Sequence, residues 1–307
     1  MLVSVCTPTF NRRPFIPSMI HCFKHQDYKG NVEWIIVDDG TDKIEDLIIK
    51  ANMPQIKYYK YDEKLTLGKK RNLMHSHAKG DIIVYMDDDD YYPPERISHA
   101  VHMLQTNPNA LCAGSSTLHI YFNEINKIVQ FGPYGPNHAT AGTFAFKKEL
   151  LEITSYNDDV SVGEEKEFLK NYTIPFVQLD PKKVILVCSH NQNTFDKRTL
   201  LVNPNPSVVK ETTLTVNDFI KNSKLRHFFT FKMHNDLEIY KAGDPIMKPD
   251  VIEYMEKKKV ERAFSIKYNG KIMYGDEILE QLNHQQSYIN LLQEKIKRFD
   301  KSDRFTM

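Results

Sequence analysis

The amino-acid sequence predicts an α/β protein with a doubly wound, mostly parallel sheet. In the first 105 residues, short apolar runs that end abruptly alternate with segments of helical periodicity, as in sheets of this class. Two of the runs end in acidic residues, VDDG at residues 37–40 and YMDDDD at residues 85–90. Ligands of these sheets bind at the carboxyl ends of the strands, so the acidic ends indicate a binding site.

Each expected strand is a short run of apolar, β-branched or aromatic residues. The first four are Leu2–Cys6, Trp34–Val37, Ile56–Tyr61 and Ile82–Met86. The expected helices place apolar residues at helical spacing. They cover Pro14–His25, Ile44–Lys50, Gly68–Ala78 and Pro93–Gln105. This alternation favours right-handed crossovers between parallel strands.

Residues 106–200 carry more mixed signals. Strand-forming residues fill Leu111–Ile128, and the Gly/Pro-rich segment Phe131–Phe144 is expected to be an irregular loop. Short helices are expected at Lys148–Ile153 and Glu164–Asn171, and a last strand at Val184–Cys188.

The pattern changes after about residue 200, where we expect a small α+β accessory region, residues 201–307. Asn269-Gly270 predicts a hairpin turn, and a helix is expected over residues 276–299 with apolar residues at 4-3 spacing. This helix has two interpretations: a coiled coil that forms a homodimer, or an amphipathic helix packed on its own domain. The second is favoured because barely three heptads are short for a stable coil.

Composition excludes several classes of protein. The formal net charge is +1 and no basic stripe is visible, which argues against nucleic acid or an anionic membrane as partner. No apolar run approaches the ~20 residues that span a bilayer, and the N-terminus lacks the features of a signal peptide. The four cysteines are widely spaced and are expected to be buried and reduced. We expect a soluble, cytoplasmic protein.

The four consecutive aspartates Asp87, Asp88, Asp89 and Asp90 need a compensating charge, because neighbouring carboxylates cannot all ionise cheaply. Mg²⁺ and Mn²⁺ prefer such oxygens and usually also bind substrate phosphates. In an extended segment Asp87 and Asp89 face one side, and Asp88 and Asp90 the other, so one pair is expected to face a ligand. The alternative is a solvated loop whose aspartates cap the helix that begins at Pro93.

Two further segments carry candidate ligand-binding residues. Asp38 and Asp39 either accept hydrogen bonds from a base or a ribose, or form a turn with the following glycine. GKKRN, residues 68–72, puts positive charge at a helix N-terminus, which favours anions. Lys69 and Lys70 are expected on the solvated face. Arg71 is the better candidate because it lies on the side of the apolar residues.

Six motifs in this order resemble the nucleotide-sugar glycosyltransferases of the GT-A fold, of the inverting family-2 type. They are TPTFNR (7–12), VDDG (37–40), GKKRN (68–72), YMDDDD (85–90), TAGTFAFKKELL (140–151) and GEEKEFL (163–169). The resemblance covers about residues 1–195. It implies a catalytic domain over residues 1–200, with nucleotide-sugar binding in about 1–105 and the acceptor and catalytic part in about 106–200.

The resemblance also implies roles for single residues. Those that would bind the donor nucleotide are Thr7, Pro8, Thr9, Asn11, Arg12, Asp39, Arg71, Asn72, Asp87 and Asp88. Those that would bind Mn²⁺ or Mg²⁺ through the D-x-D motif are Asp89, Asp87 and His190. Because the four aspartates are identical, a register of Asp88 and Asp90 stays open, and His190 is alternatively a hydrogen-bonded structural residue.

The catalytic base of the family maps to Glu165, with Glu164 as the alternative, because the usual Glu-Asp pair reads Glu-Glu here. The implied reaction moves a sugar, with inversion, from a nucleotide donor (a UDP-sugar is favoured) to a hydroxyl of a glycan, protein or small molecule. The processive members carry a Q-x-x-R-W motif and membrane helices, so a non-processive enzyme is expected. Two alternatives remain: a catalytically silent module that binds nucleotide sugar or glycan, and a nucleotidyltransferase. The segment CTPTFNRR lacks the glycine-rich phosphate loop of the latter.

Overall fold

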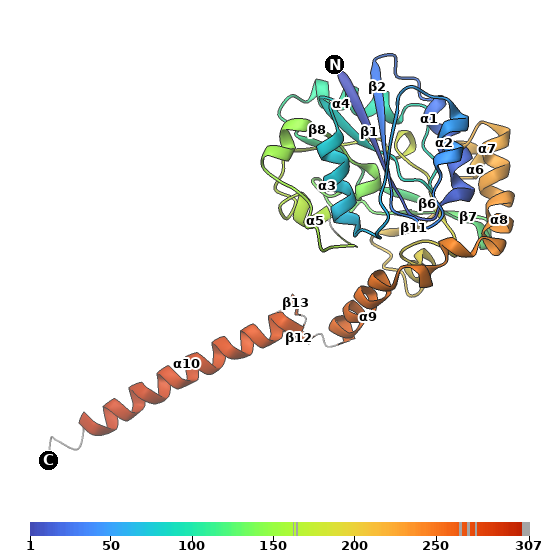
Figure 1. Ribbon diagram of the computed structural model, residues 1–307. Coiled ribbons are helices and arrows are strands. Elements are labelled where there is room, and N and C mark those ends of the chain that lie inside the picture. Colours follow the sequence, from blue (N-terminus) through green and yellow to red (C-terminus); the bar gives the residue numbers. More distant parts are fainter. Residues whose placement is uncertain (162, 164, 264–265, 269–270, 274, 303–307) are drawn as a thin grey trace. The chain divides into compact units, whose positions relative to one another are not determined.

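The computed structural model describes residues 1–161, 163, 165–263, 266–268, 271–273 and 275–302 (Figure 1). Glu164 and the expected hairpin turn Asn269-Gly270 lie outside the described residues. The chain forms two compact units, Met1–Pro249 and Asp250–Met307.

The first unit is built on a sheet of strand order β3-β2-β1-β4-β8-β5-β9. The four strands expected at the start of the chain are confirmed as β1 (Leu2–Thr9), β2 (Asn31–Asp38), β3 (Ile56–Lys60) and β4 (Ile82–Tyr85). β1 pairs in parallel with β2 and β4, and β2 pairs in parallel with β3. The sheet then continues with β8 (Ala145–Lys147), β5 (Cys112–Gly114) and β9 (Phe176–Gln178). β8 is antiparallel to both β4 and β5.

Helices cover both faces of this sheet, as the alternating pattern predicts (Figure 1). They are α1 (Ile16–Lys24), α2 (Glu45–Ala51), α3 (Leu67–His77) and α4 (Arg96–Thr106). Successive strand residues face opposite sides. Val3, Val5 and Trp34 therefore pack with α1 and α4, whereas Cys6 and Ile35 pack with α3. All four cysteines are buried and free, as expected.

A second sheet, of order β10-β6-β7-β11, completes the first unit. Its strands are β6 (Leu118–Phe122), β7 (Lys127–Phe131), β10 (Val187–Ser189) and β11 (Val209–Glu211). The expected helix at Lys148–Ile153 is a 3₁₀ turn, Lys148–Glu152, and the one at Glu164–Asn171 has a four-residue helix, α5 (Glu165–Phe168). The expected strand Val184–Cys188 begins three residues later as β10, because Leu186 pairs with Tyr91 instead.

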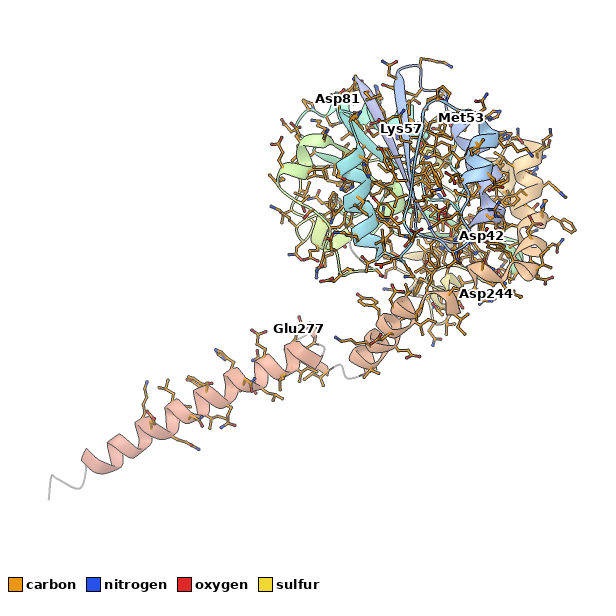
Figure 2. All side chains as sticks on the ribbon, viewed as in Figure 1. Asp42, Met53, Lys57, Asp81, Asp244 and Glu277 are labelled. Atoms are coloured by element: carbon orange, nitrogen blue, oxygen red, sulfur yellow. The ribbon has the colours of Figure 1, made fainter. Side chains whose placement is uncertain are left out.

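Residues 201–249 pack into the first unit. Their helices are α6 (Val216–Phe219), α7 (Ser223–His227) and α8 (Met233–Ile239), with a π-helical turn at Phe228–Lys232 and 3₁₀ turns at Lys241–Gly243 and Pro245–Met247. Phe229, Met233 and Leu237 are buried in the same core cluster as α1. Because α8 is packed into this core, the position of the segment that follows it is defined. That segment contacts Asn11, which follows β1 at the carboxyl edge of the sheet. Asp42 and Asp244 lie at this end of the unit, and Asp81 lies at the opposite end (Figure 2).

The second unit contains most of α9 (Pro249–Ala263), the antiparallel pair β12 (Ile266–Tyr268) and β13 (Lys271–Met273), and α10 (Gly275–Ser302). The long terminal helix expected from the sequence is confirmed. Leu279, Leu282 and Ile289 are exposed on it, and a homodimer through this helix stays a prediction. None of the helices in the described residues is long and apolar enough to cross a membrane.

Gly68→Ala is expected to destabilise the first unit by about 1–3 kcal/mol of unfolding free energy. A Cβ at Gly68 would lie 2.0 Å from the backbone oxygen of Asn157, so α3 or the segment at 157–160 must move. Gly135→Ala is the matched control, because its Cβ would meet nothing nearer than 3.8 Å. Urea unfolding measures both variants. Equal midpoints would show that α3 is not held against residues 157–160 in this way.

Candidate active site

The polar residues of the candidate site follow β1, β2 and β4 at the edge of the sheet where these parallel strands end. Thr7, near the end of β1, holds the three strands together: its hydroxyl donates to the Met86 carbonyl at 2.6 Å and accepts from the Trp34 indole at 2.9 Å. Pro8 and Thr9 are also buried in this strand. Thr7, assigned from the resemblance to nucleotide binding, is thus engaged in joining strands.

Arg12 supplies a positive charge to the aspartate cluster from within the protein. Its side chain is buried, with guanidinium nitrogens 3.7 Å from an Asp88 oxygen and 3.5 Å from Asp89 Oδ2. The guanidinium also donates to the Gln192 carbonyl at 2.8 Å. Charges buried this deeply are stable only when they are paired and hydrogen-bonded. Arg12 is therefore one reason why this acidic strand end is tolerated.

The four aspartates alternate in exposure, the pattern expected for an extended segment, although β4 itself ends before them at Tyr85. Asp88 and Asp90 are buried, and Asp87 and Asp89 are partly exposed. Asp90 accepts a hydrogen bond from the Cys188 backbone at 2.8 Å, which ties the cluster to β10. Asp87 lies against the loop between β7 and β8, where a Cβ on Gly142 would come within 2.8 Å of Asp87 Oδ2.

Burial and charge coupling divide the protons among these carboxyl groups. Burial, with repulsion from Asp89, raises the pKa of Asp88 to about 7, and burial raises the pKa of Asp90 well above its usual range. Burial also raises the pKa of Asp89. The hydrogen bond from His190 and the charge of Arg12 outweigh that effect, so this pKa lies below its usual value. Negative charge is therefore concentrated on Asp89, the carboxylate next to His190.

His190 follows β10 and meets Asp89, with Nε2 3.1 Å from Asp89 Oδ2. Asn193 Nδ2 lies 2.7 Å from the same ring nitrogen, and Nδ1 accepts from the Gln192 backbone at 3.2 Å. Because Nε2 has one in-plane position, only one of its two contacts is a hydrogen bond in a given tautomer. Burial outweighs the attraction of Asp89 and lowers the pKa of His190 to about 4, so the ring is neutral at pH 7. Neutral imidazole is the form that binds metals, and a metal ion at Nε2 requires that the ring proton move from Nε2 to Nδ1.

Asp39 and Lys70 form a buried ion pair beneath this edge, 2.8 Å between Nζ and Oδ1. The other Asp39 oxygen accepts from the Leu65 backbone at 2.6 Å. The expectation that Lys70 lies on a solvated helix face is wrong, because Asp39 draws its ammonium into the protein. Lys69 is exposed, as expected, and pairs with Asp158.

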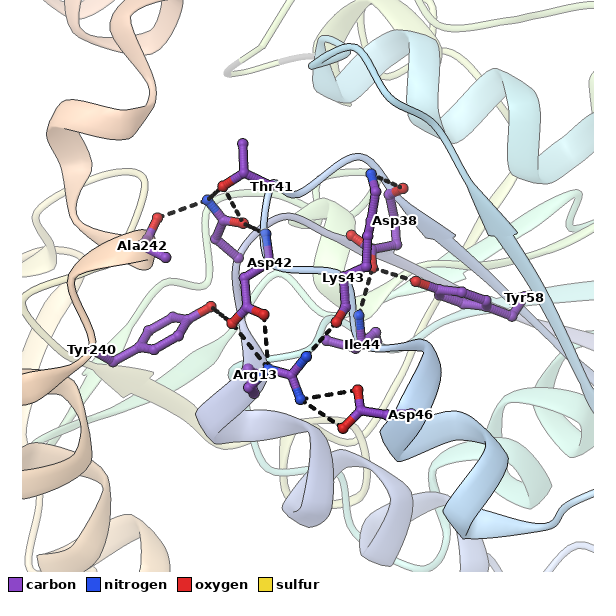
Figure 3. Close-up of polar contacts among 11 residues, drawn as sticks. Arg13, Asp38, Thr41, Asp42, Lys43, Ile44, Asp46, Tyr58, Tyr240 and Ala242 are labelled. Atoms are coloured by element: carbon purple, nitrogen blue, oxygen red, sulfur yellow. Dashed lines mark hydrogen bonds and ion pairs between the residues drawn. The ribbon is translucent and has the colours of Figure 1, made fainter.

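Asp38 serves the turn after β2. One oxygen accepts from the Gly40 backbone at 2.9 Å. The other accepts from the Tyr58 hydroxyl at 2.6 Å and from the Ile44 backbone at 3.1 Å (Figure 3). Of the two interpretations of Asp38, the turn is the one that these contacts support.

Asn11 links the β1 loop to distant parts of the chain. It adopts a left-handed backbone conformation (φ 53°), which asparagine tolerates. Its Oδ1 accepts from the Asp42 backbone at 2.9 Å, and its Nδ2 donates to the Ala242 carbonyl at 2.8 Å. Figure 3 shows that Tyr240 and Ala242, which follow α8, face the loop that carries Asp42. The amide of Asn11, assigned to the nucleotide from the resemblance, is occupied by these contacts.

Arg71 and Asn72 lie on α3. The Arg71 guanidinium lies 4.5 Å from the centre of the Tyr85 ring and 5.5 Å from that of Tyr156. Asn72 donates to the Tyr156 carbonyl at 2.8 Å and to Asp158 at 2.7 Å. Asn72 therefore holds the chain that leads to α5, and its nucleotide-binding role stays a prediction.

Glu165, the candidate base, begins α5 and accepts a hydrogen bond from the Ala141 backbone at 3.2 Å. Ala141 precedes Gly142, whose backbone lies against Asp87. One short loop thus connects the candidate base to the partly exposed side of the aspartate cluster. Glu164, the alternative base, lies outside the described residues, and its role stays a prediction.

Two buried residues at this edge, Gln192 and Lys248, were not predicted from the sequence. Gln192 donates to the Tyr240 carbonyl at 2.6 Å and to Asp244 at 3.1 Å. Lys248 is buried near the aspartate cluster although it lies far along the chain, and its charge interacts with those of Arg12 and Asp89. Neither lies in a motif, so sequence patterns offered no signal for them.

A parallel sheet extended by an antiparallel strand, with an aspartate cluster at its carboxyl edge and a helix-borne carboxylate nearby, defines the GT-A class of glycosyltransferases. The chain belongs to glycosyl transferase family 2, whose family model matches residues 4–157. The resemblance seen in the sequence motifs is thereby confirmed.

Similarity to individual proteins covers only part of each. The chain is 34% identical over 100 residues to the putative colanic acid biosynthesis glycosyl transferase WcaA of Escherichia coli K12, covering 32% of this chain and 36% of that protein. It is 33% identical over 106 residues to the UDP-Glc:alpha-D-GlcNAc-diphosphoundecaprenol beta-1,3-glucosyltransferase WfaP of Escherichia coli, covering 34% of this chain and 42% of that protein. The chain thus spans less than half the length of these relatives.

One solved structure extends the fold comparison beyond the family match. The mannosyltransferase PcManGT from Pyrobaculum calidifontis, in complex with GDP-Man and Mn²⁺, superposes with a TM-score of 0.50 at 17% identity. The superposition covers 84% of this chain and 75% of that one. At this identity the likeness establishes the shared GT-A fold.

Lys70→Met is expected to lower the unfolding free energy by roughly 3–5 kcal/mol, because it leaves the Asp39 carboxylate buried without its partner. Adding Asp39→Asn removes that charge and is expected to recover more than half of the loss. Urea unfolding of both single variants and the double variant gives the coupling energy. Additive losses would mean that the two side chains do not stabilise each other.

Proposed function

We propose that this chain transfers a sugar from a nucleotide donor to an acceptor hydroxyl, with inversion, in a metal-dependent and non-processive reaction. The observation that carries the proposal is the meeting of charged Asp89 and neutral His190 at the carboxyl edge of the sheet, 3.1 Å apart. Partly exposed Asp87 lies in the same acidic segment. A nucleotide sugar binding here brings its diphosphate next to these groups.

The residues present fit a divalent cation. Asp89 supplies a carboxylate oxygen and His190 an imidazole nitrogen, a donor set that suits Mn²⁺, and Asp87 adds an oxygen. In the described residues Asp87, Asp89 and His190 do not by themselves form a group close enough to hold a metal ion. We therefore assign the remaining ligand positions to phosphate oxygens of the donor. When bound, the ion neutralises charge on the leaving diphosphate.

The exposure pattern favours the Asp87/Asp89 register over Asp88/Asp90. Asp88 is buried against Arg12, and Asp90 is engaged by the Cys188 backbone. We assign Asp39 to recognition of the base, close to Lys70. A UDP-sugar is the first donor to test because the relative WfaP is named for UDP-Glc.

Glu165 is the proposed base. It takes the proton of the acceptor hydroxyl as that oxygen attacks the anomeric carbon, while the carbon–oxygen bond to the diphosphate breaks and its electron pair stays with the phosphate. Its contact with Ala141 holds the start of α5 against the loop beside Asp87. The acceptor is a hydroxyl of a glycan, a protein or a small molecule.

A panel of UDP- and GDP-sugars, incubated with the protein and Mn²⁺ and assayed for release of free sugar, tests the proposal without knowledge of the acceptor. Asp89→Asn is expected to lower the rate at least 100-fold, and Glu165→Gln by about 10²–10⁴-fold, the usual range for loss of a general base. Glu167→Gln is the matched control, because Glu167 is exposed on the same helix.

Two results would contradict these assignments. Binding of a donor without turnover would make the chain a nucleotide-sugar-binding module. Equal rates for Glu165→Gln and Glu167→Gln would remove Glu165 from the mechanism.

A further inference from the structure

The segment of residues 237–248 lies outside the range that the family model matches, and hydrogen bonds connect it to the candidate site. Gln192 donates to the Tyr240 carbonyl, and Asn11 donates to the Ala242 carbonyl at 2.8 Å. The Tyr240 hydroxyl donates to Asp42 at 2.9 Å (Figure 3). These contacts reach the loops that follow β1, β2 and β10, so the segment is positioned by the same edge of the sheet that carries the aspartates.

At Gly243 the backbone of this segment lies so close to Gln192 and Asn11 that a residue with a side chain would not fit. A Cβ on Gly243 would lie 2.2 Å from Gln192 Oε1 and 2.9 Å from the Asn11 backbone oxygen. Gly243 is itself buried. A side chain there would push the segment away from the site, and Lys248 with it.

Lys248 ends this segment as a buried amine. Its exposed fraction is 7%, and Nζ donates to the Thr194 hydroxyl at 3.0 Å. Among the described residues it forms no ion pair, although Asp88 and Asp89 are near enough to influence its charge. Burial, reinforced by the nearby Arg12 charge, lowers its pKa to about 6. At that pKa the side chain is mostly neutral at pH 7, and an anion bound beside it would favour the charged ammonium.

The charges around Lys248 are those that an anionic ligand requires. Arg12 and Lys70 are also buried and repel the Lys248 charge, and each of them is already paired with a carboxylate of the protein. Of these three side chains, Lys248 is therefore the one without a carboxylate partner in the described part of the chain, and an anionic ligand can charge it. A lysine ammonium is a compact point charge that suits phosphate oxygens.

We propose that Lys248 binds the diphosphate of the nucleotide donor and stabilises the charge that stays on it when the sugar leaves. The inference rests on the function proposed above and adds a binding residue from outside the family-matched segment. Lys248 takes up a proton from solvent as the diphosphate binds and keeps it during the transfer: the broken carbon–oxygen bond leaves its electrons on the diphosphate, and the acceptor proton goes to Glu165.

Binding of UDP, GDP and the corresponding nucleosides to the full chain, by calorimetry with Mn²⁺ present, tests this role. Lys248→Met is expected to weaken binding of the preferred nucleoside diphosphate at least tenfold and to leave nucleoside binding unchanged. Lys248→Arg keeps the charge and is expected to recover most of the affinity. Lys241→Met, an exposed lysine of the same segment, is the matched control and is expected to behave as the unchanged protein.

Thermal unfolding without ligand separates a ligand-binding lysine from a structural one. Lys248→Met replaces a buried amine that has no ion pair in the described residues with an apolar side chain of similar length, so its midpoint is expected to equal or exceed that of the unchanged protein. A lower midpoint together with unchanged diphosphate affinity would make Lys248 a structural residue and overturn the inference alone. Failure of the unchanged protein to bind either nucleoside diphosphate would instead overturn the proposed function, and this inference with it.

Discussion

The guanidinium of Arg12, placed 3.5–3.7 Å from carboxylate oxygens of Asp88 and Asp89, joins the loops on which the candidate site is built. Arg12 follows β1, the aspartates follow β4, and the Gln192 carbonyl that accepts from the same guanidinium follows β10. Four adjacent carboxyl groups would otherwise repel one another at a buried strand end. With this internal cation, negative charge gathers on Asp89, and the neutral ring of His190 meets that carboxylate at the edge of the cluster.

Because the site lies at strand ends, several of its polar side chains form hydrogen bonds with the protein's own backbone. Thr7 joins neighbouring strands, Asp38 closes a turn, and Asn11 holds the 237–248 segment. Buried backbone groups need partners, and the residues that begin loops are the nearest side chains able to provide them. These side chains therefore define the shape of the donor site through the loops they hold, in addition to any contact with a ligand.

The C-terminal part of the first unit extends the site beyond the family core. Residues 201–249 pack on the α1 face and then cross to the carboxyl edge, where Gln192 and Asn11 hold the backbone. This path brings a buried lysine, Lys248, toward aspartates more than 150 positions earlier in the chain. A site assembled in this way joins motif residues to residues that belong to no motif.

The sequence by itself determined the α/β class and the first four parallel strands with their helices, because hydrophobic periodicity is a local property. Strand-end chemistry made Asp87 and Asp89 candidates, whereas Glu165 and His190 became candidates through the resemblance of the motifs to a known family. The tertiary structure alone decided four features. They are the short length of α5, the burial of Lys70 beside Asp39, the pairing of Arg12 with the aspartates, and the burial of Lys248 near them. Each of these depends on groups far apart in the chain. The energy of a buried charge is set by which partner the fold brings within a few ångströms, and no local pattern contains that information.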